Sequence, residues 1–133
     1  MLDLDRIDTQ HKLPCCGVTA IAVFTGTPFR DVWGFIAKRK RGNWKGATYH
    51  SDQREALKQF NKGRTVAVKV TSRKSLSRFA REDARPGVVY MIRTTGHQQV
   101  LKDGIVVDQR GSAPIGEYWG KRKRVVHFWA KTV

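Results

Sequence analysis

A cysteine stands at a position that favours nucleophilic chemistry. Cys16 and Gly17 lie where an irregular, proline-containing lead-in gives way to an apolar run over residues 18–24, which is long enough for a buried helix. Unpaired backbone N–H groups and the helix dipole stabilise a thiolate at a helix N-terminus, and the thiolate is the attacking form. The sequence therefore predicts a reactive thiol at Cys16. Cys15 is the second candidate, and Cys16 is preferred because Gly17 follows it directly.

A nucleophilic cysteine needs a base, a group that orients the base, and a donor for the developing oxyanion. His97 begins an expected strand, and Asp108 ends the next strand across a tight turn at 103–104. In that hairpin, residues whose numbers sum to about 207 face each other, so Asp108 lies diagonal to His97 and within hydrogen-bond reach. Gln10, six residues ahead of Cys16, can fold back so that its amide points at the carbonyl under attack.

The order and spacing of these four residues resemble the papain-like cysteine peptidase superfamily, most closely the bacteriocin-leader type of peptidase and its compact, phage-borne relatives. The resemblance implies a thiolate–imidazolium pair of Cys16 and His97, with Asp108 orienting His97. It implies an oxyanion hole formed by Gln10 and the backbone N–H of Cys16. It also implies a helical half packed on an antiparallel sheet, and hydrolysis of a peptide or isopeptide bond, with deamidation or acyl transfer as alternatives.

Helices are expected mainly in the first half of the chain. The helix that carries the nucleophile should begin near Cys15 or Cys16 and end near Gly26, because this glycine is followed by a proline two residues later. Apolar residues at helical spacing predict further helices over 28–41, after Ser51 as N-cap as far as residue 60, and over 75–84, with a loop over 42–50.

The second half of the chain is rich in expected strands. Alternating or continuous β-branched and apolar residues predict strands over 65–70, 88–93, 98–102, 105–108 and 124–131, with a loop over 111–116. Helices first and strands later predict an α+β protein, with an N-terminal helical half on a C-terminal antiparallel sheet. The length suits a single domain over residues 1–133.

The chain is strongly basic, with 26 Lys and Arg against 11 Asp and Glu and a net charge of +15. Such a charge attracts polyanions, so the alternative function is binding of nucleic acid or an acidic protein on the same scaffold, with little or no hydrolase activity. Trp119, Phe128 and Trp129 would then stack on bases; otherwise they pack inward while the cations face water. Two KRKR clusters would supply the charge, at Lys38, Arg39, Lys40 and Arg41 and at Lys121, Arg122, Lys123 and Arg124.

Other classes are disfavoured. The only two cysteines are adjacent, which excludes a disulfide framework and favours a reducing compartment. The acidic N-terminus lacks a secretory signal, and no apolar run reaches the length of a membrane span. We therefore expect a cytoplasmic protein, of the host cell if phage-encoded, that acts on a peptide or protein substrate without a cofactor.

Zinc is the remaining alternative. The candidate ligands are His11, Cys15 and Cys16 with His50 or His127. Adjacent cysteines do not supply the spaced pairs of structural zinc sites, so we expect no metal.

Overall fold

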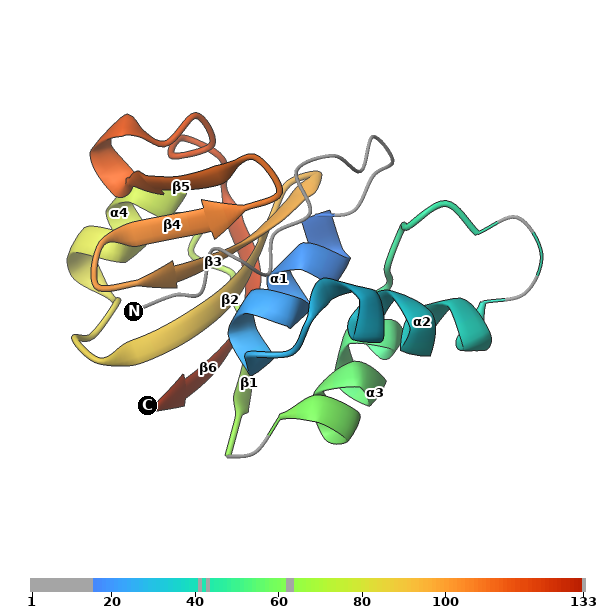
Figure 1. Cartoon of the computed structure of the whole chain (residues 1–133). Helices are drawn as coiled ribbons and strands as arrows, with labels where there is room; N and C mark the ends of the chain where they lie inside the picture. The colour runs from blue at the N-terminus through green and yellow to red at the C-terminus, as the bar shows by residue number, and fades with distance from the viewer. Residues whose placement is uncertain (1–15, 41, 43, 62–63, 133) are drawn as a thin grey trace.

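The computed structural model describes residues 16–132 except 41, 43 and 62–63 (Figure 1). The helices are α1 (Cys16–Thr25), α2 (Phe29–Arg39), α3 (His50–Phe60), α4 (Leu76–Glu82) and the short 3-10 helix η2 (Ile115–Glu117). The strands are β1 (Val66–Lys69), β2 (Val88–Thr94), β3 (His97–Lys102), β4 (Ile105–Asp108), β5 (Gly111–Pro114) and β6 (Val125–Thr132). Within the described residues, the strands form one antiparallel sheet in the order β1-β6-β2-β3-β4-β5. The α+β class predicted from the sequence is confirmed.

Helix α1 lies at the centre of the molecule, between β3 and the helices α2 and α3 (Figure 1). Every residue from Gly17 to Phe24 is buried, which accounts for the continuous apolar run in the sequence. The helix ends at Thr25, and Gly26 follows it with a φ of 72°, the left-handed conformation that glycine adopts without strain. A fully buried helix holds its first residue, Cys16, at a fixed place relative to the sheet.

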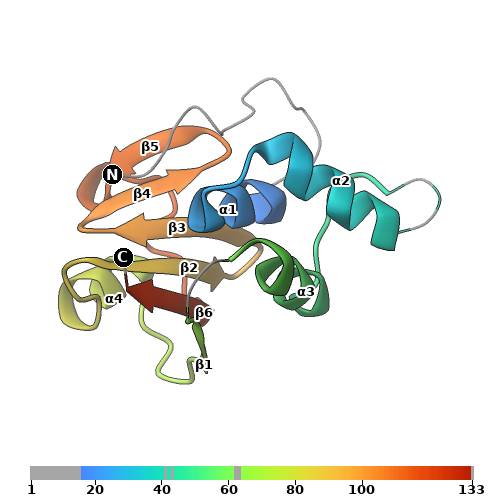
Figure 2. The same ribbon diagram turned by 60° about the horizontal axis from the view of Figure 1, so that its bottom comes forward.

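Helices cover both faces of the sheet (Figure 2). Along β2, Val89 and Met91 face the core formed with α1, α2 and α3, whereas Tyr90 and Ile92 face the core formed with α4. This alternation follows from the two-residue period of a strand. The expected packing of a helical half on a sheet therefore holds for α1 to α3, but α4 enters the chain between β1 and β2 and lies on the opposite face.

Two local predictions were wrong. Helix α3 begins at His50 with Tyr49 as N-cap, not after Ser51, because the Asp52 carboxylate accepts the Tyr49 backbone N–H at 2.8 Å. Residues 111–114, expected in a loop, form β5 opposite β4. This strand consists of Gly, Ser, Ala and Pro, so its composition lacks the β-branched and aromatic residues that indicate a strand.

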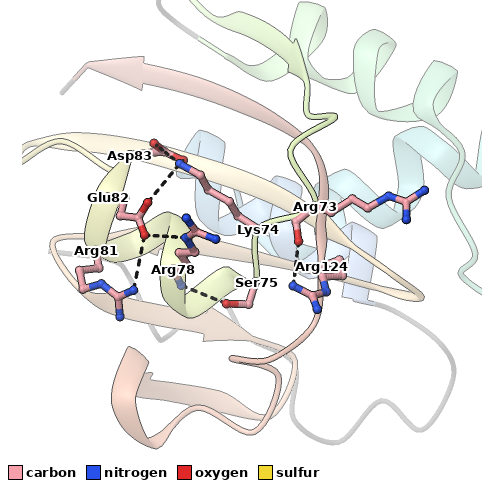
Figure 3. A network of polar contacts seen from close by, with 8 residues as sticks. All are labelled: Arg73, Lys74, Ser75, Arg78, Arg81, Glu82, Asp83 and Arg124. Carbon is pink, nitrogen blue, oxygen red and sulfur yellow. Dashed lines mark hydrogen bonds and ion pairs between the residues drawn. The ribbon is translucent and has the colours of Figure 1, made fainter.

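An exposed group of ion pairs surrounds α4 (Figure 3). We call it the α4 ion network; its members are Lys74, Arg78, Arg81, Glu82 and Asp83. Lys74 Nζ lies 3.0 Å from Asp83 Oδ1, and Arg78 Nε lies 2.7 Å from Glu82 Oε2. The Ser75 hydroxyl accepts the Arg78 N–H and caps the helix. The network joins α4 to the segment that follows β1.

Among the described helices, none is both long and apolar enough to cross a bilayer.

Candidate active site

Cys16 is the first residue of α1, and its thiol shares a hydrogen bond with the ring of His97. Burial by itself raises the pKa of this thiol. The hydrogen bond and positive charge of His97, together with the backbone N–H groups of Gln98 and Gly17, outweigh burial and bring the pKa below its usual value of 9.0. The site therefore favours the thiolate form of Cys16.

His97 is buried at the start of β3, where its Nε2 lies 3.1 Å from Asp108 Oδ2. Since Nε2 faces the carboxylate, Nδ1 is the ring nitrogen left for the Cys16 thiol. Burial lowers the pKa of His97, but the hydrogen bonds and charges of Asp108 and Cys16 raise it above 6.5 overall. The lowered pKa of the Cys16 thiol and the raised pKa of the His97 imidazole both indicate that the thiolate–imidazolium pair is stabilised.

Asp108 is buried behind His97 and accepts several hydrogen bonds. Oδ2 accepts the Tyr118 hydroxyl at 2.8 Å and the Trp119 indole N–H at 2.9 Å, and Oδ1 accepts the Arg110 backbone N–H at 2.8 Å. Burial raises the pKa of Asp108, but these bonds and the one to His97 lower it from 3.8 to about 2. The carboxylate is therefore ionised at neutral pH and its orientation is fixed.

The β3–β4 hairpin brings His97 and Asp108 together as its register predicts. Val100 faces Val107 and Lys102 faces Ile105, so the facing residue numbers sum to 207. Asp108 thus lies diagonal to His97 on one face of the sheet. The turn before His97 contains Gly96 with a φ of 72°, and the Lys123 ammonium donates to the Thr95 carbonyl in that turn. The β2–β3 turn before His97 and the Asp108 carboxylate of β4 therefore both contribute to the position of His97.

Tyr118 and Trp119 belong to this site, although sequence reasoning placed neither of them there. The Tyr118 hydroxyl lies 3.0 Å from His97 Nε2, and the Trp119 ring centroid lies 4.8 Å from that of His97. The guanidinium of Arg110 covers the Trp119 ring at 4.3 Å. Both residues follow η2, far from any strand pattern. The available signal was chemical and concerns Tyr118: a buried Tyr needs a partner for its O–H, and Asp108 is a suitable acceptor.

A cavity of about 200 Å³ opens beside the thiol. Its lining residues come from the start of α1, the loop before α3 and the β2–β3 turn: Cys16, Gly17, Gly46, Ala47, Thr48, Arg93, Gly96, His97 and Gln98. Gly17 packs so closely on Thr48 that an added methyl group would collide with the Thr48 hydroxyl. The side chain of Gln98 donates to that hydroxyl at 3.3 Å and is also bonded to Gln53. The cavity gives a substrate access to Cys16 and His97.

The two KRKR clusters lie on separate elements, at the end of α2 and before β6. Lys40 and Arg39 pair with Asp52 at 2.7 and 3.6 Å. In the second cluster, three side chains donate to backbone carbonyls: Lys121 to Gly116, Lys123 to Thr95 and Arg124 to Arg73. Many of these cations therefore bind carboxylates and carbonyls of the protein itself. Arg41 lies outside the described residues.

Two of the aromatic residues near the second cluster pack inward. Trp129 is buried against α1 to α3, and Phe128 packs on the α4 side with Phe79 and Tyr90. The Trp119 ring contacts His97 and Arg110, but Trp119 is 46% exposed. For Phe128 and Trp129, the structure supports packing in the protein over stacking on bases, whereas Trp119 keeps an exposed ring surface.

Three sequence candidates, Gln10, His11 and Cys15, lie outside the described residues. Within the described part, no cluster of three or more His, Cys, Asp and Glu side chains could hold a metal ion. His50 and His127 instead pack together with Trp129, with the two imidazole centroids 4.7 Å apart. Burial, with the charges of His50 and Arg93, lowers the pKa of His127 to about 4.

Comparisons of the chain with protein-family models, curated proteins and solved structures find no match. The papain-like resemblance of Cys16, His97 and Asp108 therefore stays a prediction from the sequence.

Proposed function

We propose that the protein is a cysteine hydrolase of the papain-like type that cleaves a peptide or isopeptide bond. The observation that supports this most strongly is the hydrogen-bonded chain from the Cys16 thiol through His97 to Asp108, beside an open cavity. The pKa of the thiol is lowered and that of the imidazole is raised, which is the condition for an activated nucleophile paired with a general acid.

In the proposed reaction, the Cys16 thiolate attacks the carbonyl carbon and forms a tetrahedral oxyanion. The His97 imidazolium donates its Nδ1 proton to the amine nitrogen as the C–N bond breaks, which leaves a thioester on Cys16. Neutral His97 then removes a proton from water, the hydroxide attacks the thioester, and the acid product leaves as the thiolate re-forms. Asp108 stays ionised throughout, since its pKa of about 2 is far below neutral pH, and stabilises the imidazolium.

The oxyanion requires donors near the thiol. The backbone N–H of Cys16 is one candidate, and Gln10 is the second by resemblance to the family, although it lies outside the described residues. Deamidation would use the same residues with ammonia as the leaving group, and acyl transfer would replace water with an amine. The products distinguish these reactions: hydrolysis releases a peptide amine and an acid, deamidation releases ammonia, and acyl transfer joins an added amine to the acyl group.

The test is the pH dependence of alkylation by a sub-stoichiometric dose of iodoacetamide, with mass spectrometry to locate the label. Cys16 should react fast at neutral pH, with a midpoint below its usual pKa of 9.0. His97→Ala should slow this reaction by about tenfold or more, because it removes the charge that stabilises the thiolate. Cys15→Ser is the matched control and should keep the fast reaction. Slow and equal labelling of both cysteines would contradict the proposal.

A second candidate function, binding of nucleic acid or an acidic protein, is favoured by the net charge of +15. Lys38 and Arg39 at the end of α2 and Arg122 before β6 are exposed. Replacing these three residues with Gln should weaken salt-sensitive binding to a polyanion such as heparin without changing the alkylation of Cys16. Binding that survives this replacement and high salt would contradict the second function.

A further inference from the structure

Outside the Cys16–His97 pair, the charge of the cavity wall comes from Arg93. Apart from the Cys16–His97 pair, Arg93 is the one charged side chain among its described lining residues, and none of these residues carries a carboxylate. Asp108 is the acid next to the site, but it lies behind His97, and both of its oxygens accept hydrogen bonds within the protein. Apart from the Cys16 thiolate, which is paired with the His97 imidazolium, an anionic group that enters the cavity therefore meets no like charge from these lining residues.

The position of Arg93 follows from the pleat of β2. Val89, Met91 and Arg93 share the face that α1 covers, and Arg93 lies near the end of the strand, where it is exposed. It stands opposite Gln98 of β3 and His127 of β6. The pairing of β2 with β6 becomes irregular between Arg93 and Thr94, and such irregularities redirect side chains at the ends of strands.

The polar neighbours of Arg93 in the cavity are already bonded within the protein. Gln98 bonds to Thr48 and Gln53, so that, outside the Cys16–His97 pair, the remaining wall consists of glycines, Ala47 and Arg93. Among the described residues, Arg93 forms no ion pair with a carboxylate. A guanidinium presents parallel N–H groups that match the two oxygens of a carboxylate.

We propose that Arg93 makes this cavity a subsite for an acidic side chain, so that the preferred peptide substrate carries Asp or Glu close to the scissile bond. The inference rests on the proposed function, because it assigns the substrate class of the same thiol site. Arg93 acts here as a specificity residue: it binds the substrate carboxylate and takes no part in proton transfer.

The test compares acidic and neutral electrophiles of equal size at Cys16. The probes are the iodoacetyl derivatives of aspartic acid amide and asparagine amide, and a longer pair built on glutamic acid amide and glutamine amide. For each pair, the alkylation rate of Cys16 by the acidic probe is divided by its alkylation rate by the amide probe. This ratio is then divided by the same ratio for N-acetylcysteine amide, which corrects for the intrinsic reactivity of the two probes. In at least one pair this ratio should be about three to five, as expected for one partly solvated charge pair.

Variants of Arg93 should change this ratio in a graded way. Arg93→Gln should bring it to about one, Arg93→Lys should keep part of the preference, and Arg93→Glu should reverse it, as expected for a contact between two charges. Arg85→Gln is the matched control, because it removes the same charge from an exposed arginine on the α4 side of the sheet. It should leave the ratio unchanged.

Two results would overturn the subsite. One is an equal fall of the ratio in Arg85→Gln and Arg93→Gln, which would assign the preference to the field of the whole protein. The second such result is an unchanged ratio in Arg93→Gln while neutral probes still label Cys16 fast and in a His97-dependent way. In that case the proposed function would stand and the acidic subsite would not. Absence of fast labelling in the unmodified protein would instead overturn the proposed function and the subsite together.

Discussion

The molecule contains two groups of charged side chains that differ mainly in their access to water. In the candidate site, Asp108 is 2% exposed and contacts His97, Tyr118 and Trp119. In the α4 ion network, the side chains of Glu82 and Asp83 are 34% and 40% exposed (Figure 3). Both groups pair carboxylates with cations at short distances.

The comparison teaches that distance alone does not define the role of an ion pair. A buried carboxylate has lost its water, so each of its oxygens needs donors from the protein, and Asp108 receives them from several side chains and a backbone N–H. Exposed pairs exchange protein contacts for water at little cost in free energy. The buried group therefore fixes the orientation of His97, whereas the α4 ion network contributes mainly to the surface.

The largest expected effect is the loss of the buried carboxylate. Asp108→Ala should lower the free energy of unfolding by about 3–5 kcal/mol, because it leaves His97 and buried donors without their acceptor. Asp83→Ala, the matched change in the α4 ion network, should cost less than about 1 kcal/mol. Urea unfolding of both variants measures the difference. If Asp108→Ala does not fold, Asp108→Asn is measured in its place. Equal losses in the free energy of unfolding at positions 108 and 83 would contradict the difference between the buried and the exposed ion pairs.

Acid should destabilise the protein through Asp108. Its pKa is lower in the folded protein than in the unfolded chain, so its contribution to stability is complete above about pH 3.8 and is lost as the pH falls towards about 2. The change in free energy that this shift contributes between about pH 5 and pH 2 is roughly 2 kcal/mol. As the pH is lowered from about 5 to 2, the free energy of unfolding should fall more in the unmodified protein than in Asp108→Asn. The difference between the two falls should be about this amount. Parallel curves would contradict this assignment.

A smaller effect is expected at Tyr118. Tyr118→Phe removes the hydroxyl that donates to Asp108 but leaves the Trp119 and Arg110 donors in place. The free energy of unfolding should fall by about 1–2 kcal/mol. Because the Tyr118 hydroxyl also lies beside His97 Nε2, the alkylation rate of Cys16 should change as well. A loss of stability with no change in that rate would give Tyr118 a purely structural role.

The smallest effect is expected in the α4 ion network. Glu82→Gln removes the charge that Arg78, Lys74 and Arg81 share. The cost in free energy of unfolding should be small at low salt, smaller than that of Tyr118→Phe, and should disappear near 1 M salt, where exposed charges are screened. Thermal unfolding at both salt concentrations measures it. A large, salt-independent cost would mean that this network resembles the buried one.

Much of the local structure was predictable from particular residues. The apolar run after Cys16 and the glycine at 26 fixed the extent of α1, and Asp103-Gly104 fixed the register of the β3–β4 hairpin. The strand β5 was missed because its small residues carry no strand pattern. Gln10 and Cys15 lie outside the described residues, so the expected oxyanion donor stays a prediction.

By itself, the sequence determined the elements whose signals are local: helical periodicity, turn residues and the hairpin that sets His97 diagonal to Asp108. Only the tertiary structure decided that β6 lies between β1 and β2, that α4 covers the face opposite α1, and that Tyr118 and Trp119 reach Asp108. It also decided that Cys16 meets His97 from the far end of the chain. The reason is physical: neighbouring residues set backbone conformation, whereas long-range pairing depends on how buried surfaces fit together.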